Sequence, residues 1–383
     1  MYLRPFKAVI FALLLSGAGL SGESLVGTYD SEEVRFRLIT VADNLERPWG
    51  MVFLPEGTRS QGIDVSGGIL ITERTGGLKL IVGDQIFDIR GLPRIASVGQ
   101  GGLLDLALHP EFDQNEYVYF SYSASYGSGL GTRVGRGRFV DNNIEEFEVL
   151  FSMERPTRGS HHFGSRLAFA GDGTLFFSIG DRGDRTRAQD LGEHAGKILR
   201  INDDGSIPED NPFLRARGAL PEIYPFGHRN AQGLIYDELT GTLWAHEHGP
   251  RGGDEVNIVK RGVNYGWPEI TYGREYSGEY IAPTAKPGLE QPIIYWVPSI
   301  APSGLAIYRS DAFSEWSGDL FAGALAGQEL RRMVVEGNEI VHQETLLKNR
   351  VGRIRDVREG PDGNLWILID DTRGKLIRIE PAG

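Results

Sequence analysis

The sequence contains no cysteine, which excludes disulfide bonds, thiolate metal ligands and a lipid-modified N-terminal cysteine. Basic residues are in the minority: 40 lysines and arginines stand against 52 aspartates and glutamates, for a net charge of −12. This balance disfavours nonspecific binding to nucleic acid. The apolar run Ala8–Leu15 is too short to supply the roughly 20 residues of a membrane-spanning helix. We therefore expect a fold stabilised by burial of its apolar residues, which make up 40% of the chain.

The first 22 residues have the pattern of an export signal. Arg4 and Lys7 give a positive start, the apolar run Ala8–Leu15 follows, and small residues occupy most of Ser16–Gly22. We expect this signal peptide to precede a domain of residues 23–383. The protein is then periplasmic or secreted, without a stable membrane span, and a monomer. A membrane anchor or a buried strand is the alternative for this segment.

A repeated pattern runs through the rest of the chain. Each copy is an apolar strand, a turn that contains Pro, Asp or Gly, and a second apolar strand, which is typical of a β-hairpin. The copies begin at Pro48, Gly102, Arg166, Gly233, Gly304 and Asp356. No long stretch has helical periodicity, and the 52 glycines suit many tight turns. Six such units predict an all-β fold, a single-domain six-bladed β-propeller, rather than a sandwich or an irregular β fold.

Polar residues stand just before the first strand of several copies. In a propeller these positions meet at one rim of the central channel, although they are far apart in the sequence. They include Gln100, His161, His162, Arg229, Asn230, Gln232, Arg353 and Arg355. Several guanidinium groups in one pocket select a polyanionic ligand, because each can bind a carboxylate or phosphate in a bidentate way.

Two further features follow second strands of the repeats. Asp181 ends the third copy, where it is either a turn residue or the partner that orients a rim histidine. The segment His246–Glu255 combines a Gly-Pro turn with carboxylates, which suits Ca²⁺. Its spacing alone also leaves open a zinc site at His246 and His248, or a tight turn without metal.

Taken together, these segments resemble the soluble quinoprotein sugar dehydrogenases of the glucose/sorbosone dehydrogenase family. The resemblance covers about residues 38–381 and rests on separated motifs in one order. The motifs are Gly99-Gln100-Gly101-Gly102-Leu103-Leu104, His162-Phe163-Gly164-Ser165-Arg166-Leu167, Ile179-Gly180-Asp181, Gly227-His228-Arg229-Asn230-Ala231-Gln232-Gly233, Glu247-His248-Gly249-Pro250, Asn264-Tyr265-Gly266-Trp267-Pro268 and Arg353-Ile354-Arg355-Asp356-Val357. Each motif is weak by itself, and their order is specific.

The resemblance implies a propeller that binds pyrroloquinoline quinone (PQQ), a flat dione with three carboxylates. It implies oxidation of aldoses at the anomeric C1 to lactones, with hydride passed to the quinone and electrons to an unnamed acceptor. His162 resembles the general base for the anomeric hydroxyl, Asp181 its orienting partner, and Arg229 the group that stabilises the developing oxyanion. The implied cofactor-binding residues are Gln100, His162, Arg229, Asn230, Gln232, Arg353 and Arg355. The carbonyls of Gly249 and Pro250 resemble the ligands of a Ca²⁺ that also binds the quinone.

Two positions depart from the glucose-specific relatives. Ala326 stands where they carry a cofactor-binding lysine, and His161 replaces an aspartate before the catalytic histidine. Both changes bear on cofactor affinity and sugar preference, and neither removes the base or the arginines. Two other functions fit a propeller: a calcium-dependent hydrolase such as a lactonase, and a non-enzymatic binding module.

Overall fold

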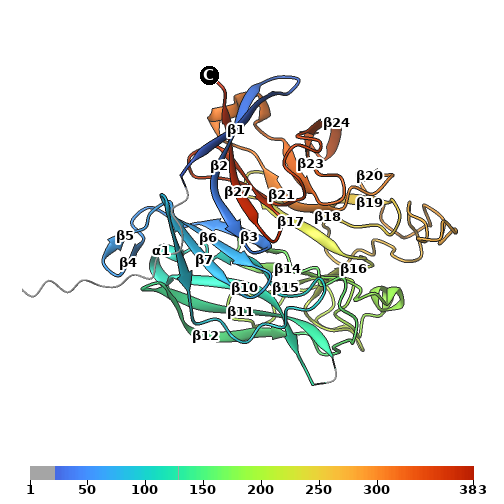
Figure 1. Ribbon diagram of the computed structural model, residues 1–383. Helices are drawn as coiled ribbons and strands as arrows, with labels where there is room; N and C mark the ends of the chain where they lie inside the picture. The colour runs from blue at the N-terminus through green and yellow to red at the C-terminus, as the bar shows by residue number, and fades with distance from the viewer. Residues whose placement is uncertain (1–21, 128) are drawn as a thin grey trace, which may run out of the picture.

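The computed structural model describes residues 22–127 and 129–383. The predicted export signal lies outside these residues, apart from Gly22. The described chain forms six antiparallel sheets around a central axis (Figure 1), so the predicted all-β, six-bladed propeller in a single domain is confirmed. No helix within the described ranges has the length and apolar character needed to cross a membrane.

The first three blades have four strands each. The first contains β3 (Pro48–Phe53), β6 (Ile69–Glu73), β7 (Leu78–Val82) and β8 (Gln85–Ile89). The second contains β9 (Leu103–Leu108), β10 (Tyr117–Ser125), β11 (Leu130–Val140) and β12 (Asn143–Ser152). The third contains β13 (Leu167–Phe169), β14 (Leu175–Ile179), β15 (Lys197–Ile201) and β16 (Ile223–Phe226). A small hairpin of β4 (Arg59–Ser60) and β5 (Ile63–Asp64) interrupts the first blade.

The next two blades follow the same plan. The fourth contains β17 (Ala231–Asp237), β18 (Thr242–Glu247), β19 (Asp254–Ile258) and β20 (Ile294–Trp296). The fifth contains β21 (Pro302–Ile307), β22 (Leu320–Ala324), β23 (Glu329–Glu336) and β24 (Glu339–Leu346). The helical segments are short: α1 (Phe112–Asn115), and the 3₁₀ turns Arg185–Gln189 and Asp311–Trp316.

The sixth blade closes the ring by combining both parts of the chain. Its C-terminal strands β25 (Ile354–Glu359), β26 (Leu365–Ile369) and β27 (Gly374–Pro381) are joined by β2 (Arg35–Leu45) and β1 (Ser24–Asp30). Strand β2 pairs with β27, with Phe36 opposite Pro381 (Figure 1, blue beside red). Backbone hydrogen bonds between β2 and β27 thus close the ring of blades.

Each predicted hairpin corresponds to the two inner strands of a blade. The second strands β6, β14, β22 and β26 are buried along their whole length, because neighbouring blades pack on both faces. This explains why they read as continuous apolar runs rather than alternating ones. The apolar core lies between blades, as where Trp316 packs against Phe36, Tyr308 and Phe321. Burying a side chain of this size contributes ~1.5–3 kcal/mol.

A cluster of four charged side chains fills the centre of the ring. Arg166 lies 3.2 Å from Asp105 and 2.9 Å from Asp356, and Arg358 lies 3.0 Å from each of the same carboxylates. The innermost strands approach closely here: a Cβ on Gly50 would lie 2.7 Å from Asp105 Oδ1. Because Asp105, Arg166 and Asp356 are buried, each of these charges needs its partner. The cluster joins blades two, three and six, and the backbone N–H of Met51 in blade one donates to Asp356.

Candidate active site

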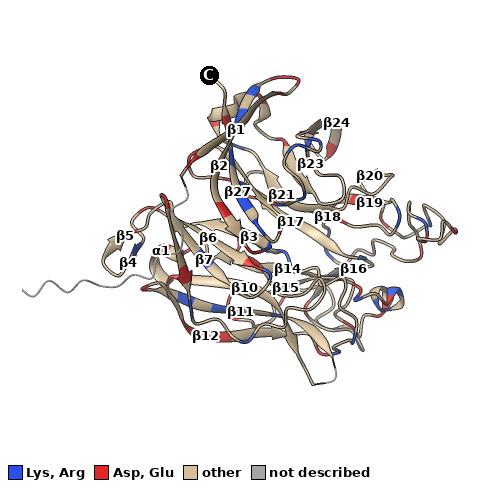
Figure 2. Ribbon diagram, viewed as in Figure 1, with Lys and Arg blue, Asp and Glu red and all other residues tan. Residues whose placement is uncertain are grey.

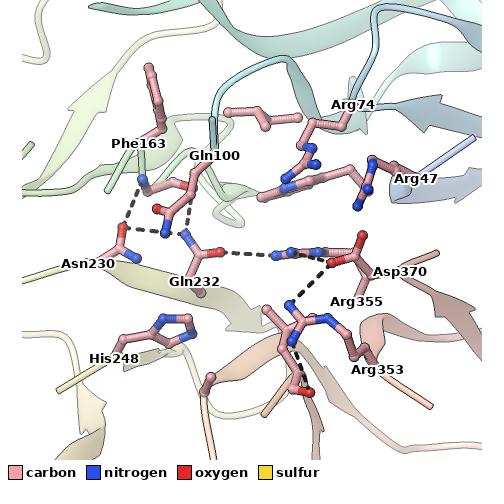
Figure 3. A pocket seen from close by; sticks show the side chains of 15 residues that line it. Arg47, Arg74, Gln100, Phe163, Asn230, Gln232, His248, Arg353, Arg355 and Asp370 are labelled. Carbon is pink, nitrogen blue, oxygen red and sulfur yellow. Dashed lines mark hydrogen bonds and ion pairs between the residues drawn. The ribbon is translucent and has the colours of Figure 1, made fainter. Parts of the chain in front are cut away.

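Two adjoining cavities open at the rim where the innermost strands begin. The inner cavity has a volume of about 380 Å³ and the outer one of about 770 Å³, and both are lined by Gln100, His248 and Ala301. Five predicted residues line the inner cavity: Gln100, Asn230, Gln232, Arg353 and Arg355 (Figure 3). The outer cavity is lined by Gln100, His162, Arg229, Gly249, Pro250 and Ala326. The predicted convergence of the rim loops therefore brings all of these side chains and turns to one mouth of the channel.

His162 is held by a carboxylate on one side and faces the outer cavity. Its Nδ1 lies 2.6 Å from Asp181 Oδ1, and no protein partner is found for Nε2 in the described part of the chain. The other Asp181 oxygen, Oδ2, accepts a hydrogen bond from the indole Nε1 of Trp267 at 2.9 Å. With Nδ1 donating to the carboxylate, Nε2 is the free acceptor of the imidazole.

The electrostatics of this pair keep the histidine neutral and the aspartate charged. Burial lowers the pKa of His162, and the hydrogen bond with Asp181 only partly offsets it, while the charge of Arg229 lowers it further. Burial alone would raise the pKa of Asp181, but hydrogen bonds from His162 and from the backbone of Gly183 bring it below the ordinary value. A neutral imidazole beside a carboxylate is the form required of a general base.

Amide side chains form one end of the inner cavity (Figure 3). Asn230 Oδ1 accepts from the backbone N–H of Gly164, and Gln232 Nε2 donates to the carbonyl of the same residue, both at 3.1 Å. Gln100 Oε1 accepts from the backbone N–H of His162 at 2.8 Å. These bonds hold the loop that carries His162, whose backbone has a left-handed φ of 53°.

Arginines form the opposite end of the inner cavity (Figure 3). Arg355 donates to Asp370 Oδ2 at 3.0 Å and to Gln232 Oε1 at 3.3 Å, and Arg353 lies 3.5 Å from Asp370. Burial lowers the pKa of Arg355 to about 10, and its Nε is buried without a hydrogen-bond partner. Arg47 and Arg74 complete this end. Over the molecule both signs of charge are interspersed (Figure 2), so this arginine cluster is a local feature of an acidic protein.

Glu247 orients the loop that presents Arg229 and Asn230. Its Oε2 accepts from the backbone N–H of Asn230 at 3.1 Å and from that of Arg229, and its Oε1 lies 2.7 Å from His228 Nδ1. The ring of His228 stacks on Tyr265 with centroids 4.6 Å apart. Glu247 is buried, and these three contacts satisfy its two carboxylate oxygens.

The predicted calcium ligands lie in a tight turn beside Arg229. The carbonyl of Gly249 accepts from Arg229 Nη1 at 3.0 Å, and the N–H of Gly249 donates to Asp254 Oδ1 at 2.8 Å. Asp254 also accepts from the backbone of Ile300 and Ala301, which fixes this turn against the next blade. The described residues contain no group of three or more His, Asp or Glu side chains placed to hold a metal.

The zinc interpretation of His246 and His248 finds no support. His246 Nε2 lies 3.3 Å from the carbonyl of Gly304, and His248 Nε2 lies 2.6 Å from that of Pro302. Burial lowers the pKa of His246 to about 4 and that of His248 well below its ordinary value, so both rings are neutral donors to backbone. These histidines join the fourth and fifth blades.

Comparisons with known proteins agree with this architecture. Residues 45–378 match the family model described as glucose/sorbosone dehydrogenase. The chain belongs to this family. It is 42% identical over 348 residues to the aldose sugar dehydrogenase YliI of Escherichia coli, covering 88% of this chain and 91% of the relative.

Two solved structures of relatives show the same fold. The soluble aldose sugar dehydrogenase from Escherichia coli in its apo form superposes with a TM-score of 0.86 at 40% identity, covering 90% of this chain and 99% of that one. The PQQ-bound form of the aldose sugar dehydrogenase from Streptomyces coelicolor superposes with a TM-score of 0.71 at 27% identity. That comparison covers 95% of this chain and 100% of the other.

Several residues at the mouth of this glucose/sorbosone dehydrogenase family member escaped sequence-based prediction. Arg47, Trp49, Arg74 and Asp370 line the inner cavity, and Trp267 binds Asp181. Arg47 holds the same place before the first repeat that His162 and Arg229 hold before later ones. Arg74 and Asp370 follow second strands, as Asp181 does. Extending the comparison of lead-in and exit residues to the first and last repeats would have found Arg47, Arg74 and Asp370, but not the two tryptophans.

Proposed function

We propose that the chain oxidises aldoses at the anomeric C1 to lactones, using PQQ and Ca²⁺, with His162 as general base. The observation that carries this proposal is His162 itself: an imidazole oriented by Asp181, with Nε2 free, beside a cavity lined by arginines and amides. The family match and the PQQ-bound relative support the same reaction class. The protein's export to the periplasm or beyond belongs to this proposal.

The inner cavity fits a flat polyanion. Its volume of about 380 Å³ lies in the range of small-ligand sites, ~300–1,000 Å³. One end presents guanidinium groups, including the unpaired, buried Nε of Arg355, which matches carboxylates. The other end presents the amides of Gln100, Asn230 and Gln232, which match the carbonyl oxygens of a dione.

The two proposed calcium ligands are of the right chemical type, but two ligands are too few to bind the ion. The carbonyl oxygens of Gly249 and Pro250 are hard ligands of the kind that Ca²⁺ prefers. Ca²⁺ takes about 6–8 oxygens, so two carbonyls need oxygens from the cofactor, substrate or water to complete the shell. In this structure the Gly249 carbonyl accepts a hydrogen bond from Arg229, and its second lone pair remains available to a cation.

Each side chain of the mouth has one task in this proposal. His162 Nε2 accepts the proton of the anomeric hydroxyl, while Asp181 fixes the ring and stabilises the imidazolium that forms. Arg229, whose guanidinium lies 5.5 Å from the Trp267 ring, stabilises negative charge that develops in the transition state. When bound, PQQ supplies the hydride acceptor and Ca²⁺ a Lewis acid for its dione.

The test is dye reduction by purified apo-protein with glucose and other aldoses. PQQ and Ca²⁺ are supplied together, and each is left out in turn. We expect activity only with both additions, and the relative rates then rank the sugars. No activity together with no quinone binding would favour the lactonase or the non-enzymatic binding propeller instead.

A further inference from the structure

Two arginines enter the inner cavity from the first blade. Arg47 directly precedes β3 and Arg74 directly follows β6, and these strands are antiparallel neighbours, so both residues reach the same rim. Their backbones are fixed: Arg74 N–H donates to the carbonyl of Arg47 at 3.0 Å, and Arg47 N–H donates to that of Asp371 at 2.8 Å. The Cα positions from which the two side chains extend are therefore fixed.

Both guanidinium groups lack a protein partner. Each arginine is half-buried and lines the inner cavity, and in the described ranges neither side chain forms a hydrogen bond or an ion pair. Burial lowers the pKa of Arg74, and Arg47 and Arg353 add repulsion that Asp370 only partly offsets. The buried arginines of the core differ in this respect, since Arg166 and Arg332 are each surrounded by carboxylates.

The side chains at this end of the cavity carry an excess of positive charge, which favours binding of an anion. Arg47, Arg74, Arg353 and Arg355 face a single carboxylate, Asp370, which already binds Arg355 and lies near Arg353. Four guanidinium groups against one carboxylate give this end a net charge of +3, and Arg47 and Arg74 have no partner of their own among the described residues. A cavity that keeps such an excess half-buried is complementary to a ligand with about three negative charges.

We propose that Arg47 and Arg74 form a carboxylate subsite that binds one end of the cofactor and supplies part of its affinity. This subsite rests on the proposed function and adds to it residues from the first blade. Both arginines line only the inner cavity, whereas His162 lies in the outer one, so their ligand is the bound cofactor rather than the reacting sugar. Figure 3 shows them on the same side as Asp370 and opposite the amides.

The experiment measures equilibrium binding rather than turnover. Apo-protein with excess Ca²⁺ is titrated with PQQ and, separately, with its trimethyl ester, which keeps the dione and removes the negative charges. The proteins are the wild type, Arg47→Gln, Arg74→Gln, the double variant, and Arg217→Gln as a control. Arg217 is an exposed loop residue that does not line either cavity. Thermal unfolding of each variant checks that the fold is kept.

We expect each single substitution to weaken PQQ binding about tenfold to a hundredfold, as loss of a charge-assisted hydrogen bond does. The double variant weakens it further, Arg217→Gln leaves it unchanged, and the ester binds the wild type and the double variant equally. PQQ binding that is as tight in the double variant as in the wild type overturns the subsite. Equal losses of affinity for PQQ and for the ester overturn it as well, because the arginines then do not interact with the negative charge of the carboxylates. Failure of the wild type to bind PQQ overturns the proposed function itself.

Discussion

Trp267 donates its indole N–H to Asp181 Oδ2 at 2.9 Å, using the carboxylate oxygen that His162 leaves free. His162, Asp181 and the indole thus form one chain of hydrogen bonds. The Trp267 ring also lies under two guanidinium groups, those of Arg185 and Arg229, each 5.5 Å from it. Trp267 therefore contacts both Asp181 and Arg229, and we expect it to act as a positioning residue that aligns Asp181 with His162.

Replacing Trp267 by Phe removes the hydrogen bond and keeps an aromatic face. We expect kcat to fall about tenfold, since Asp181 loses one of its fixed contacts, with little change in PQQ affinity. The control is Trp366→Phe, which removes an equivalent indole bond, to Asp362 Oδ1 at 3.0 Å, far from the mouth. Steady-state kinetics and a PQQ titration measure both effects. Equal kcat losses in the two variants would assign Trp267 a purely structural role.

Replacing His162 by Ala tests the base directly. We expect turnover to fall by about 10²–10⁴, the contribution typical of a general base, while PQQ binding stays largely intact. His342 is exposed, lies in β24 of the fifth blade and lines neither cavity, so His342→Ala is the control. Near-normal turnover of His162→Ala would refute the assignment.

The pH dependence of kcat/KM follows from the lowered pKa of His162. Burial and the charge of Arg229 favour the neutral ring, so activity should persist below pH 6.5 and decline only as pH falls through the lowered pKa. In Arg229→Gln one of the charges that opposes protonation is gone, so the acid limb of the residual activity moves to higher pH. A pH–rate profile of both proteins checks the sign. An acid limb at lower pH in the variant would contradict it.

Glu247→Gln should disturb the presentation of Arg229 and Asn230. A glutamine oxygen can still accept the two backbone N–H groups that Oε2 now binds, but it carries no charge, and the NH₂ group then faces His228 Nδ1 in place of an acceptor. We expect PQQ affinity to fall roughly tenfold and the melting temperature to fall as well. Glu238→Gln, on the exposed turn of the same blade, should change neither. Calorimetric titration and thermal unfolding provide the measurements.

Calcium and PQQ should bind cooperatively, because Gly249 and Pro250 alone provide too few ligands for Ca²⁺. We expect Ca²⁺ to tighten PQQ binding by roughly 5–150-fold, and PQQ to tighten Ca²⁺ binding by the same factor. Mg²⁺ should replace Ca²⁺ poorly, since it demands a near-ideal octahedron and gives up water reluctantly. The measurement is the affinity for PQQ, determined by titration in the presence of a chelator, of Ca²⁺ and of Mg²⁺. An unchanged affinity in all three would remove Gly249 and Pro250 as ligands.

The blades could be predicted because their signals are local. Runs such as Ile69–Glu73 and Leu365–Ile369 are apolar over their whole length and bounded by turn residues, and this pattern needs only neighbouring residues to be recognised. The pairing of the strand that closes the ring, β2, could not be predicted from local sequence. Strand β2 pairs with β27 at the far end of the chain, and no local pattern in residues 35–45 specifies that partner.

Some residues of the candidate site could be predicted, because they are polar residues at the beginning of the first strand of a repeat. His162, Arg229 and Arg355 were found in this way, because all rim loops of a propeller converge. The aspartate of the third repeat was found by its place after a second strand, and its contact with His162 is what the structure adds.

The amino-acid sequence by itself determined the six hairpins, the all-β class and the set of polar loops at one rim, because strand and turn preferences are properties of short segments. Only the tertiary structure decided which atoms meet. Trp267 is 86 residues from Asp181, and Arg47 and Arg74 share a cavity with Arg355, which follows them by 308 and 281 residues. Such contacts depend on ring closure and on the angle between blades, and these arise from packing among distant strands that no single segment encodes.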